Sequence, residues 1–168
     1  MDDPLIPDDI VEISTEMLHK FLRLARGING SGFLQYASAD KNNVLVKYFS
    51  SYADYKRANP DSAARPKAFD YYFADRADAE MLIVREPMKI MTALPMVQSV
   101  VLYAPVDSTY MKVDIDRETA AKYFDIDFME MSLNDNKWRK FVDKNIIDSS
   151  KRNAFLSRFA AESGDNTE

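Results

Sequence analysis

The chain has 168 residues, of which 46% are hydrophobic and 29% charged, with a formal net charge of −5 and no cysteine. This length and composition fit one globular domain whose core is large enough to fold without a metal or a disulfide. The lack of cysteine excludes disulfides, thiolate nucleophiles and cysteine-ligated metal centres. The chain has no apolar run of about 18 residues, and its start, MDDPLIPDDI, lacks a signal-peptide pattern, so we expect a cytoplasmic protein with no membrane contact.

Charge divides this single domain, residues 1–168, into distinct parts. Residues 1–12 form an acidic N-terminal arm without a basic residue, residues 134–162 a basic helical segment, and residues 163–168 a polar tail. The stretch from Lys137 to Phe159 carries seven basic residues against two acidic ones, a net +5 in a chain of net −5. This asymmetry indicates an interaction surface or an internal contact between the two signs.

The first half of the chain predicts helices. Residues 14–27 place Met17, Leu18 and Phe21 on one helical stripe, and Ser14 is a suitable N-cap. His19 lies away from that stripe, so we expect it to face solvent. Residues 43–58 also keep a helical period of apolar and tyrosine side chains, and helix is preferred there. The alternative is a strand over the first six of these residues, because valine, tyrosine and phenylalanine favour strands.

The middle of the chain predicts a hairpin. Residues 69–95 fit either strands or a helix that begins after Asp75 and stops before Pro87, and the sequence leaves both open. Residues 97–103 and 109–115 alternate as strands on either side of the loop APVDS, which predicts an antiparallel hairpin spanning 97–115. On its second strand, polar residues share one face: Tyr110, Lys112 and Asp114.

The last third predicts helices. Asp116 caps a short helix, RETAAKYF, and Asp148 caps the second of two helices within the basic segment. The predicted fold is therefore α+β, with N-terminal helices, a small central antiparallel sheet and C-terminal helices.

The sequence has few combinations of residues that are typical of a catalytic site. With a single histidine, no histidine pair is available for a metal, and no nucleophile elbow accompanies it. The run GINGSG follows a helix and has no Gly-Lys-Ser/Thr element, so it predicts a helix end and a turn, since a phosphate loop would precede a helix. Four aspartates near a strand end could offer oxygen ligands to magnesium, and the sequence leaves that question open: Asp114, Asp116, Asp125 and Asp127. No cofactor is expected.

The basic segment is the candidate partner-binding site, and its residues are Lys137, Trp138, Arg139, Lys140, Lys144, Lys151, Arg152 and Arg158. We expect a non-catalytic protein–protein interaction protein, such as an adaptor, a chaperone-like factor or a subunit of a larger assembly, including a viral or phage assembly. Its partner would be another protein or a second copy. The alternative is a nucleic-acid-binding regulator that uses the same basic residues, and the third hypothesis is a carboxylate-based, metal-dependent enzyme.

Overall fold

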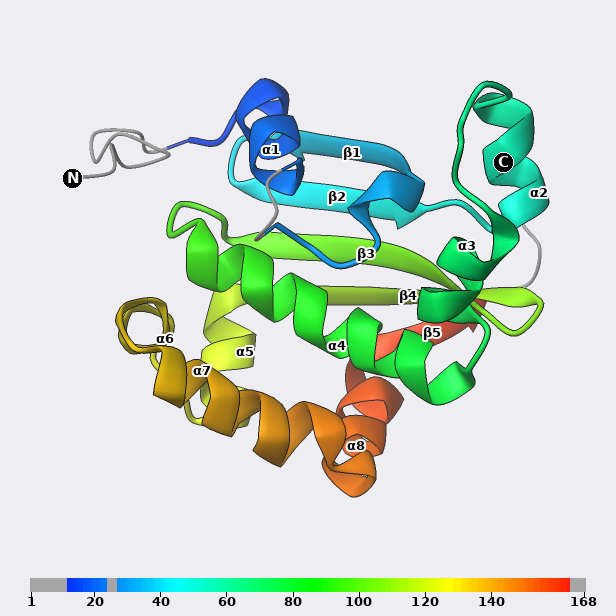
Figure 1. Cartoon of the computed structure of the whole chain (residues 1–168). Coiled ribbons are helices and arrows are strands. Elements are labelled where there is room, and N and C mark those ends of the chain that lie inside the picture. Colours follow the sequence, from blue (N-terminus) through cyan, green and yellow to red (C-terminus); the bar gives the residue numbers. More distant parts are fainter. Residues whose placement is uncertain (1–11, 24–26, 164–168) are drawn as a thin grey trace.

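The computed structural model describes residues 12–23 and 27–163, and these form an α+β fold in which helices pack on a five-stranded sheet (Figure 1). The predicted fold class is confirmed. The elements, in chain order, are α1 (Thr15–Leu22), the short helix η1 (Ser31–Phe33), β1 (Leu34–Asp40), β2 (Asn43–Tyr48), α2 (Tyr52–Ala58), α3 (Pro66–Phe73), α4 (Arg76–Ala93), β3 (Ser99–Val106), β4 (Thr109–Asp116), α5 (Arg117–Phe124), α6 (Phe128–Leu133), α7 (Asp135–Val142), the π-helical turn η2 (Asp143–Ile147), α8 (Ser149–Phe159) and β5 (Ala160–Ser163).

The sheet has the strand order β1-β2-β3-β4-β5. The predicted hairpin is confirmed as β3 and β4, which pair antiparallel from Ser99 with Asp116 to Val106 with Thr109, so the turn between them shrinks to Asp107 and Ser108. The sheet is larger than expected, because β1 and β5 add to its edges. It is also mixed, because β2 and β3 run parallel while the other pairs are antiparallel.

The predicted helix over residues 43–58 is wrong in its first part. Asn43–Tyr48 is strand β2, and only Tyr52–Ala58 is helical. Val44, Val46 and Tyr48 are buried while the residues between them are not, which is the alternation of a strand with one covered face. The local sequence carries both periods, and pairing with β1 and β3 on either side selects the strand.

Residues 69–95, which the sequence left open, contain the end of α3 and the whole of α4, with no strand. Asp75 caps α4 and accepts a hydrogen bond from Ala77 N at 2.8 Å, as the helical alternative predicted. The predicted stop before Pro87 is wrong, because α4 continues to Ala93. Proline cannot donate to the carbonyl of Ile83 one turn earlier, which costs about 3 kcal/mol in a helix interior. Burial of six large apolar side chains of α4 offsets that cost, since each contributes about 1.5–3 kcal/mol: Leu82, Ile83, Val84, Met88, Ile90 and Met91.

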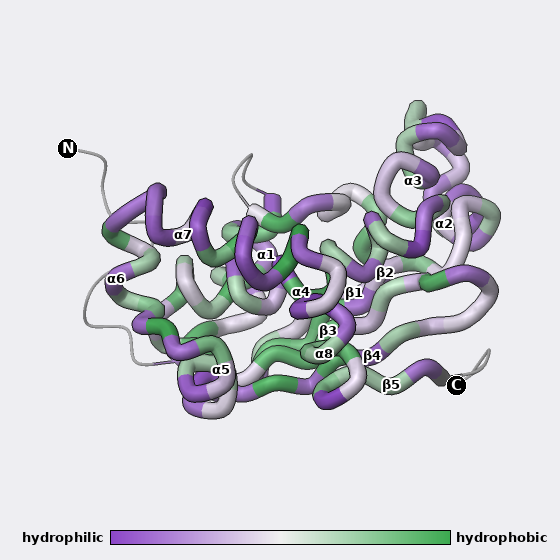
Figure 2. The backbone as a smooth tube through the Cα atoms, turned by 90° about the horizontal axis from the view of Figure 1, so that it is seen from below, coloured by the Kyte–Doolittle hydropathy of each residue, from purple (hydrophilic) through white to green (hydrophobic). Residues whose placement is uncertain are grey.

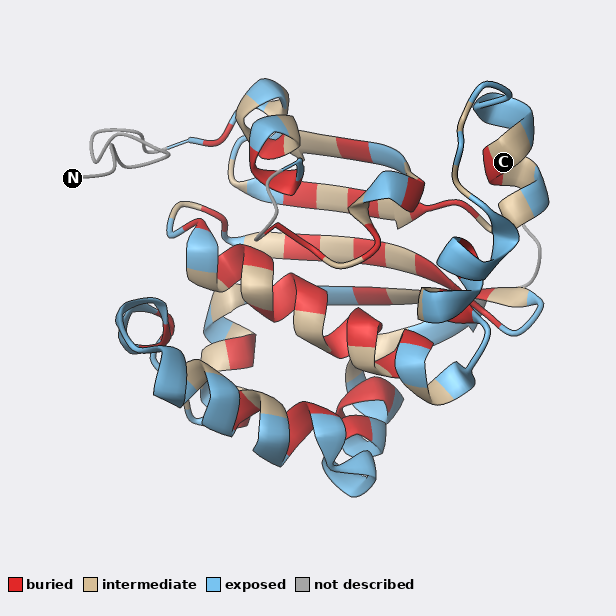
Figure 3. Ribbon diagram, in the orientation of Figure 1, coloured by how far each residue is buried: buried red, intermediate tan, exposed pale blue. Residues whose placement is uncertain are grey.

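Helices cover one face of the sheet, and α4 lies along β3 (Figures 1 and 2). In Figure 3 most of β2 and the first part of β3 alternate between buried and half-buried residues, because alternate side chains point toward α4 and away from it. The buried set of the three central strands includes Val46, Leu102 and Val113, each 0% exposed. Within the described ranges, no helix is long and apolar enough to cross a membrane.

The free edge of β1 is closed by α1. Ser14 caps α1 as predicted, and Leu18 and Phe21 are buried. The expectation that His19 faces solvent is wrong: the side chain is half-buried, and its Nε2 lies 2.6 Å from the carbonyl oxygen of Ala37 on β1. The helical stripe identified the apolar side correctly, but β1 was not predicted, so nothing indicated a partner for the polar side. Leu24 and Ala25 of the predicted helix lie outside the described residues.

The C-terminal helices follow the expected caps. Asp116 accepts a hydrogen bond from Thr119 N at 2.8 Å at the start of α5, and Asp148 accepts one from Lys151 N at 2.9 Å at the start of α8. The basic segment is not helical to its end, because Ala160–Ser163 forms β5 against β4. The acidic arm, except Glu12, and residues 164–168 of the tail lie outside the described residues.

Candidate interaction surface

The basic segment exposes only part of its predicted site. Four of its cationic side chains are exposed and make no side-chain hydrogen bond or ion pair with another described residue: Arg139, Lys140, Lys144 and Lys151. Lys137 is also exposed, but its Nζ lies 2.7 Å from Glu130 Oε2. These side chains lie on α7, on α8 and on the turn between them, among exposed Asp143 and Asp148, so their positive charge is partly balanced locally.

The aromatic residues of the basic segment pack inside the protein. Trp138 is half-buried with its ring centroid 5.6 Å from that of Phe141. The guanidinium of Arg158 lies 5.5 Å from the ring centroid of Tyr123 and 5.3 Å from that of Phe159. A single-stranded nucleic acid would need exposed rings between the cations for base stacking. The arrangement around α7 and α8 therefore suits an acidic protein surface better than a row of bases.

Arg152 is buried, so it is not part of the exposed surface that the other cations of the predicted set form. The residue is 6% exposed, and its Nη1 donates to the carbonyl oxygens of Ile146 at 2.9 Å and Ile147 at 3.2 Å. Its Nε lies 3.7 Å from Glu80 Oε2, a distance that fits an ion pair but is too long for a hydrogen bond. Arg152 faces inward because it satisfies the carbonyls left at the end of η2, which the sequence did not reveal.

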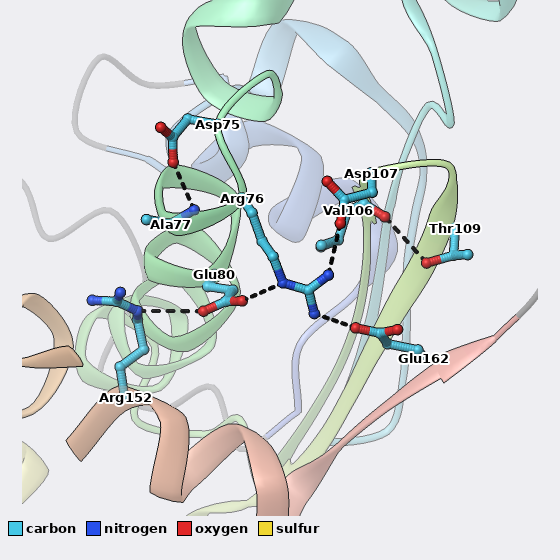
Figure 4. Close-up of polar contacts among 9 residues, drawn as sticks. All are labelled: Asp75, Arg76, Ala77, Glu80, Val106, Asp107, Thr109, Arg152 and Glu162. Atoms are coloured by element: carbon cyan, nitrogen blue, oxygen red, sulfur yellow. Dashed lines mark hydrogen bonds and ion pairs between the residues drawn. The ribbon is translucent and has the colours of Figure 1, made fainter. Parts of the chain in front are cut away.

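A network of carboxylates around Arg76 joins the start of α4 to the β3–β4 turn and to β5 (Figure 4). Arg76 donates to Glu80 at 2.7 Å, to Asp107 at 2.7 Å and to Glu162. These hydrogen bonds, that to Glu162 above all, raise the pKa of Arg76 above its ordinary value. Because Arg76 reaches α4, the β3–β4 turn and β5 together, we interpret the network as a clamp that holds β5 in place.

Glu86 is the most unusual carboxyl group of the described chain. It lies on α4 with 0% exposure, and burial raises its pKa above the ordinary 4.5 although Arg85 Nε lies 2.8 Å from Oε1. Its Oε2 has no hydrogen-bond partner among the described residues. Burial of this kind is a feature of catalytic acids, but Glu86 does not line the small neighbouring cavity of about 230 Å³, which is lined by Arg85 and Asp78 among others.

The four candidate magnesium ligands do not come together. Asp116 caps α5, and hydrogen bonds from Thr119 hold its pKa below the ordinary range. Asp127 caps α6, Asp125 ends α5 with a φ of 53°, and Asp114 lies on β4. No group of three or more possible acidic or histidine metal ligands occurs within residues 12–23 and 27–163.

Gly30 of the GINGSG run has a φ of 71°, and a Cβ there would lie 3.2 Å from the ring of Tyr48, so the run forms a tight turn.

The remaining feature is the open sheet face, the side of the sheet opposite α4. Two adjacent rows of side chains cross it from β1 to β4. The first row, the tyrosine–lysine row, consists of Tyr36, Lys47, Tyr103 and Lys112. The second row, the mixed row, consists of Ser38, Leu45, Val101 and Asp114. All eight side chains are half-buried or exposed, with Tyr36 at 52% exposure.

Contacts within the tyrosine–lysine row, and one with Tyr110 of β4 beside it, orient its side chains. The Nζ of Lys47 lies 5.8 Å from the ring centroid of Tyr103 and 4.9 Å from that of Tyr110, and Lys112 Nζ lies 5.6 Å from Tyr103. Cations over aromatic rings stabilise each other weakly at exposed sites, so these side chains are positioned without being buried. Beside them Leu45 and Val101 leave apolar surface half-exposed, and Asp114 adds a negative charge at one end.

Sequence reasoning found two strands of this face, β3 and β4, and assigned side chains to faces only for β4. The alternation in β4 placed Lys112 and Asp114 on a polar side, but β2 was predicted to be a helix and β1 was not predicted. The alternation of Val44, Val46 and Tyr48 was the signal that could have revealed the rest. Comparison with known proteins found no matching family model, no matching curated protein and no matching solved structure.

Proposed function

We propose that this protein is a non-catalytic protein–protein interaction protein, such as an adaptor or an assembly subunit, and that the open sheet face is its docking surface. The observation that supports this most directly is the pair of rows crossing β1 to β4, where apolar, aromatic and charged side chains remain half-exposed together. Protein interfaces combine an apolar centre with a polar rim and are enriched in tyrosine.

The half-exposed apolar side chains of this face support docking in a further way. A sheet face that meets only water is usually lined by polar side chains, and parallel strands such as β2 and β3 are usually covered on both faces. Here Leu45, Val101 and Tyr103 lie next to one another across β2 and β3, in positions where polar residues would suffice if the face met only water. Covering them with a partner would remove apolar surface from water, at about 25 cal/mol per Å².

The exposed cations of α7 and α8 are proposed as a second, weaker contact for an acidic protein surface. Solvent-exposed charges of this kind influence the rate of association and its salt dependence more than the affinity. A nucleic-acid-binding function is the alternative for these residues. It has less support, because the aromatic rings of the segment pack internally and a chain of net charge −5 repels a polyanion outside the segment.

Site-specific photo-crosslinking tests the proposed docking surface. A photoreactive amino acid replaces Val101 on the open face and, in a matched control, Lys122 on the exposed side of α5. After irradiation in an extract of the native source, we expect protein adducts at position 101 that are absent at position 122. Equal or absent adducts at the two positions would contradict the proposal. Adducts that consist of nucleic acid would favour the alternative.

A further inference from the structure

The two rows of the open sheet face are complementary to each other. Tyr103 and Val101 are two residues apart on β3, and Lys112 and Asp114 are two residues apart on β4, paired with them in register. The corresponding pairs are Lys47 and Leu45 on β2 and Tyr36 and Ser38 on β1. Each position of the tyrosine–lysine row thus has a neighbour in the mixed row that could contact it favourably across an interface.

A two-fold axis that runs between the two rows would use this complementarity. Rotation by 180° about such an axis places the tyrosine–lysine row of one copy over the mixed row of the other, strand over strand. Tyr103 then meets Val101 of the second copy, and Lys112 meets Asp114 of the second copy. By symmetry each contact occurs twice, as required of an isologous interface. On β2, the stem of Lys47 would cover Leu45 of the second copy.

We propose that the open sheet face binds a second copy of this chain, so that two sheets stack face to face in a symmetric dimer. This inference rests on the proposed function and specifies its partner. Stacked sheets lie about 10 Å apart with their strands rotated by about 30°, so contacts are best near the centre, where β3 and β4 supply Tyr103 and Lys112.

The area of the open sheet face determines how stable the dimer is expected to be. The sheet has five strands about 4.8 Å apart, and its longest strands have eight residues with a rise of about 3.4 Å each. Width times length gives an area of roughly 600 Å² for the face. A standard stable interface buries about 800 Å² on each partner. The dimer should therefore be reversible and dependent on concentration.

Single-stranded nucleic acid is a weaker candidate for this face, although tyrosine and lysine side chains are typical of base-stacking platforms. Both lysines already lie over the ring of Tyr103, which limits access of a base to that ring. Asp114 adjoins Lys112 on the same strand and would repel a phosphate backbone. A second copy, by contrast, uses Asp114 as the partner of Lys112.

Charge reversal tests the dimer by analytical ultracentrifugation of the purified chain across a concentration series. Lys112→Asp and Asp114→Lys should each weaken the dimer by about tenfold or more, because each places like charges together twice. The double variant should restore it. An equimolar mixture of the two single variants should form a heterodimer, since two lysines on one copy then face two aspartates on the other. Circular dichroism of each variant checks that the fold is retained.

Thiol cross-linking gives a second measurement that needs no charge reversal, and the cysteine-free chain suits it. Val101→Cys and Tyr103→Cys variants are mixed and treated with a short bis-maleimide, because stacked sheets are too far apart for a disulfide. The mixture should cross-link more efficiently than either variant alone, and Lys122→Cys should not cross-link.

The outcomes separate this inference from the proposed function. The proposed dimer is contradicted if the wild-type chain stays monomeric at every concentration. It is also contradicted if the chain forms a dimer that neither single variant weakens. Failure of the double variant and of the mixture to restore association contradicts it as well. If position 101 still captures a different protein from extract, the proposed function stands without the dimer. If single-stranded RNA binds the face, and Lys112→Asp weakens while Asp114→Lys strengthens that binding, both fail.

Discussion

Thr15 on α1 and Ala39 on β1 exchange two hydrogen bonds. The Thr15 hydroxyl donates to the carbonyl oxygen of Ala39 at 3.1 Å and accepts from its backbone N–H at 3.0 Å. Together with the contact of His19 to Ala37, this places side chains of α1 where a further strand would otherwise pair. An unpaired strand edge is a template for aggregation, so α1 protects the sheet at β1. A partner is therefore not expected to add a strand at the β1 edge.

Thr15→Val tests this protection. Valine keeps the shape of threonine but leaves the Ala39 N–H and carbonyl without partners, and we expect a loss of about 1–2 kcal/mol in the free energy of unfolding. Thr15→Ser, which keeps the hydroxyl, should lose less than half as much. Urea denaturation measures both variants. An unchanged stability of Thr15→Val would show that water replaces the hydroxyl and that α1 does not secure the edge.

Arg152→Ala should destabilise the fold by about 3 kcal/mol, because it leaves the buried carbonyl oxygen of Ile146 without its donor and removes one of the two cations beside buried Glu80. Arg139→Ala removes an exposed cation from the neighbouring helix and should change stability by less than about 0.5 kcal/mol. Thermal unfolding of the two variants gives the comparison. Equal effects would return Arg152 to the exposed basic site from which the structure removes it.

Glu86→Gln should change how stability depends on pH. Burial raises the folded-state pKa of Glu86 above 4.5, so the folded chain holds a proton that the unfolded chain has already released. Its contribution to stability therefore falls as the pH rises from about 4.5 through the raised pKa, with a slope of at most about 1.4 kcal/mol per pH unit. Glutamine lacks this titration, so the variant should gain stability relative to wild type over that window.

Denaturation at a series of pH values tests this, with Glu118→Gln as a control at an exposed position of α5. The control should follow the wild-type curve. Parallel curves for wild type and Glu86→Gln would mean that the buried carboxyl titrates as in the unfolded chain.

The exposed cations of α7 and η2 should not make the protein a nucleic-acid binder. We expect no tight binding of random-sequence DNA or RNA at low salt, and a variant with Arg139→Glu, Lys140→Glu and Lys144→Glu should behave like wild type. Fluorescence anisotropy over a salt series is the measurement. Binding that falls steeply with the logarithm of salt concentration, and that this variant loses, would favour the alternative function.

Local signals determined much of the helical part of the fold. Ser14, Asp116 and Asp148 were identified as helix caps from sequence, because a capping side chain bonds to backbone within its own turn. The hairpin of β3 and β4 was also predictable, since two alternating strands flank a short polar turn. In each case the residues that decide the structure lie within a few positions of one another.

Only the tertiary structure decided the rest. Residues 43–48 carry both a helical and a strand period, and the parallel pairing of β2 with β3, more than fifty residues later, selects the strand. From sequence, Arg152 and His19 were expected on the surface. In the structure, Arg152 contacts a carbonyl oxygen of η2 and His19 contacts one of β1. The open sheet face depends most on long-range pairing, because its rows join residues from β1 to β4. A sequence places side chains along one strand, but which strands lie side by side depends on contacts between distant segments, and those contacts alone bring Lys47, Tyr103 and Lys112 into one row.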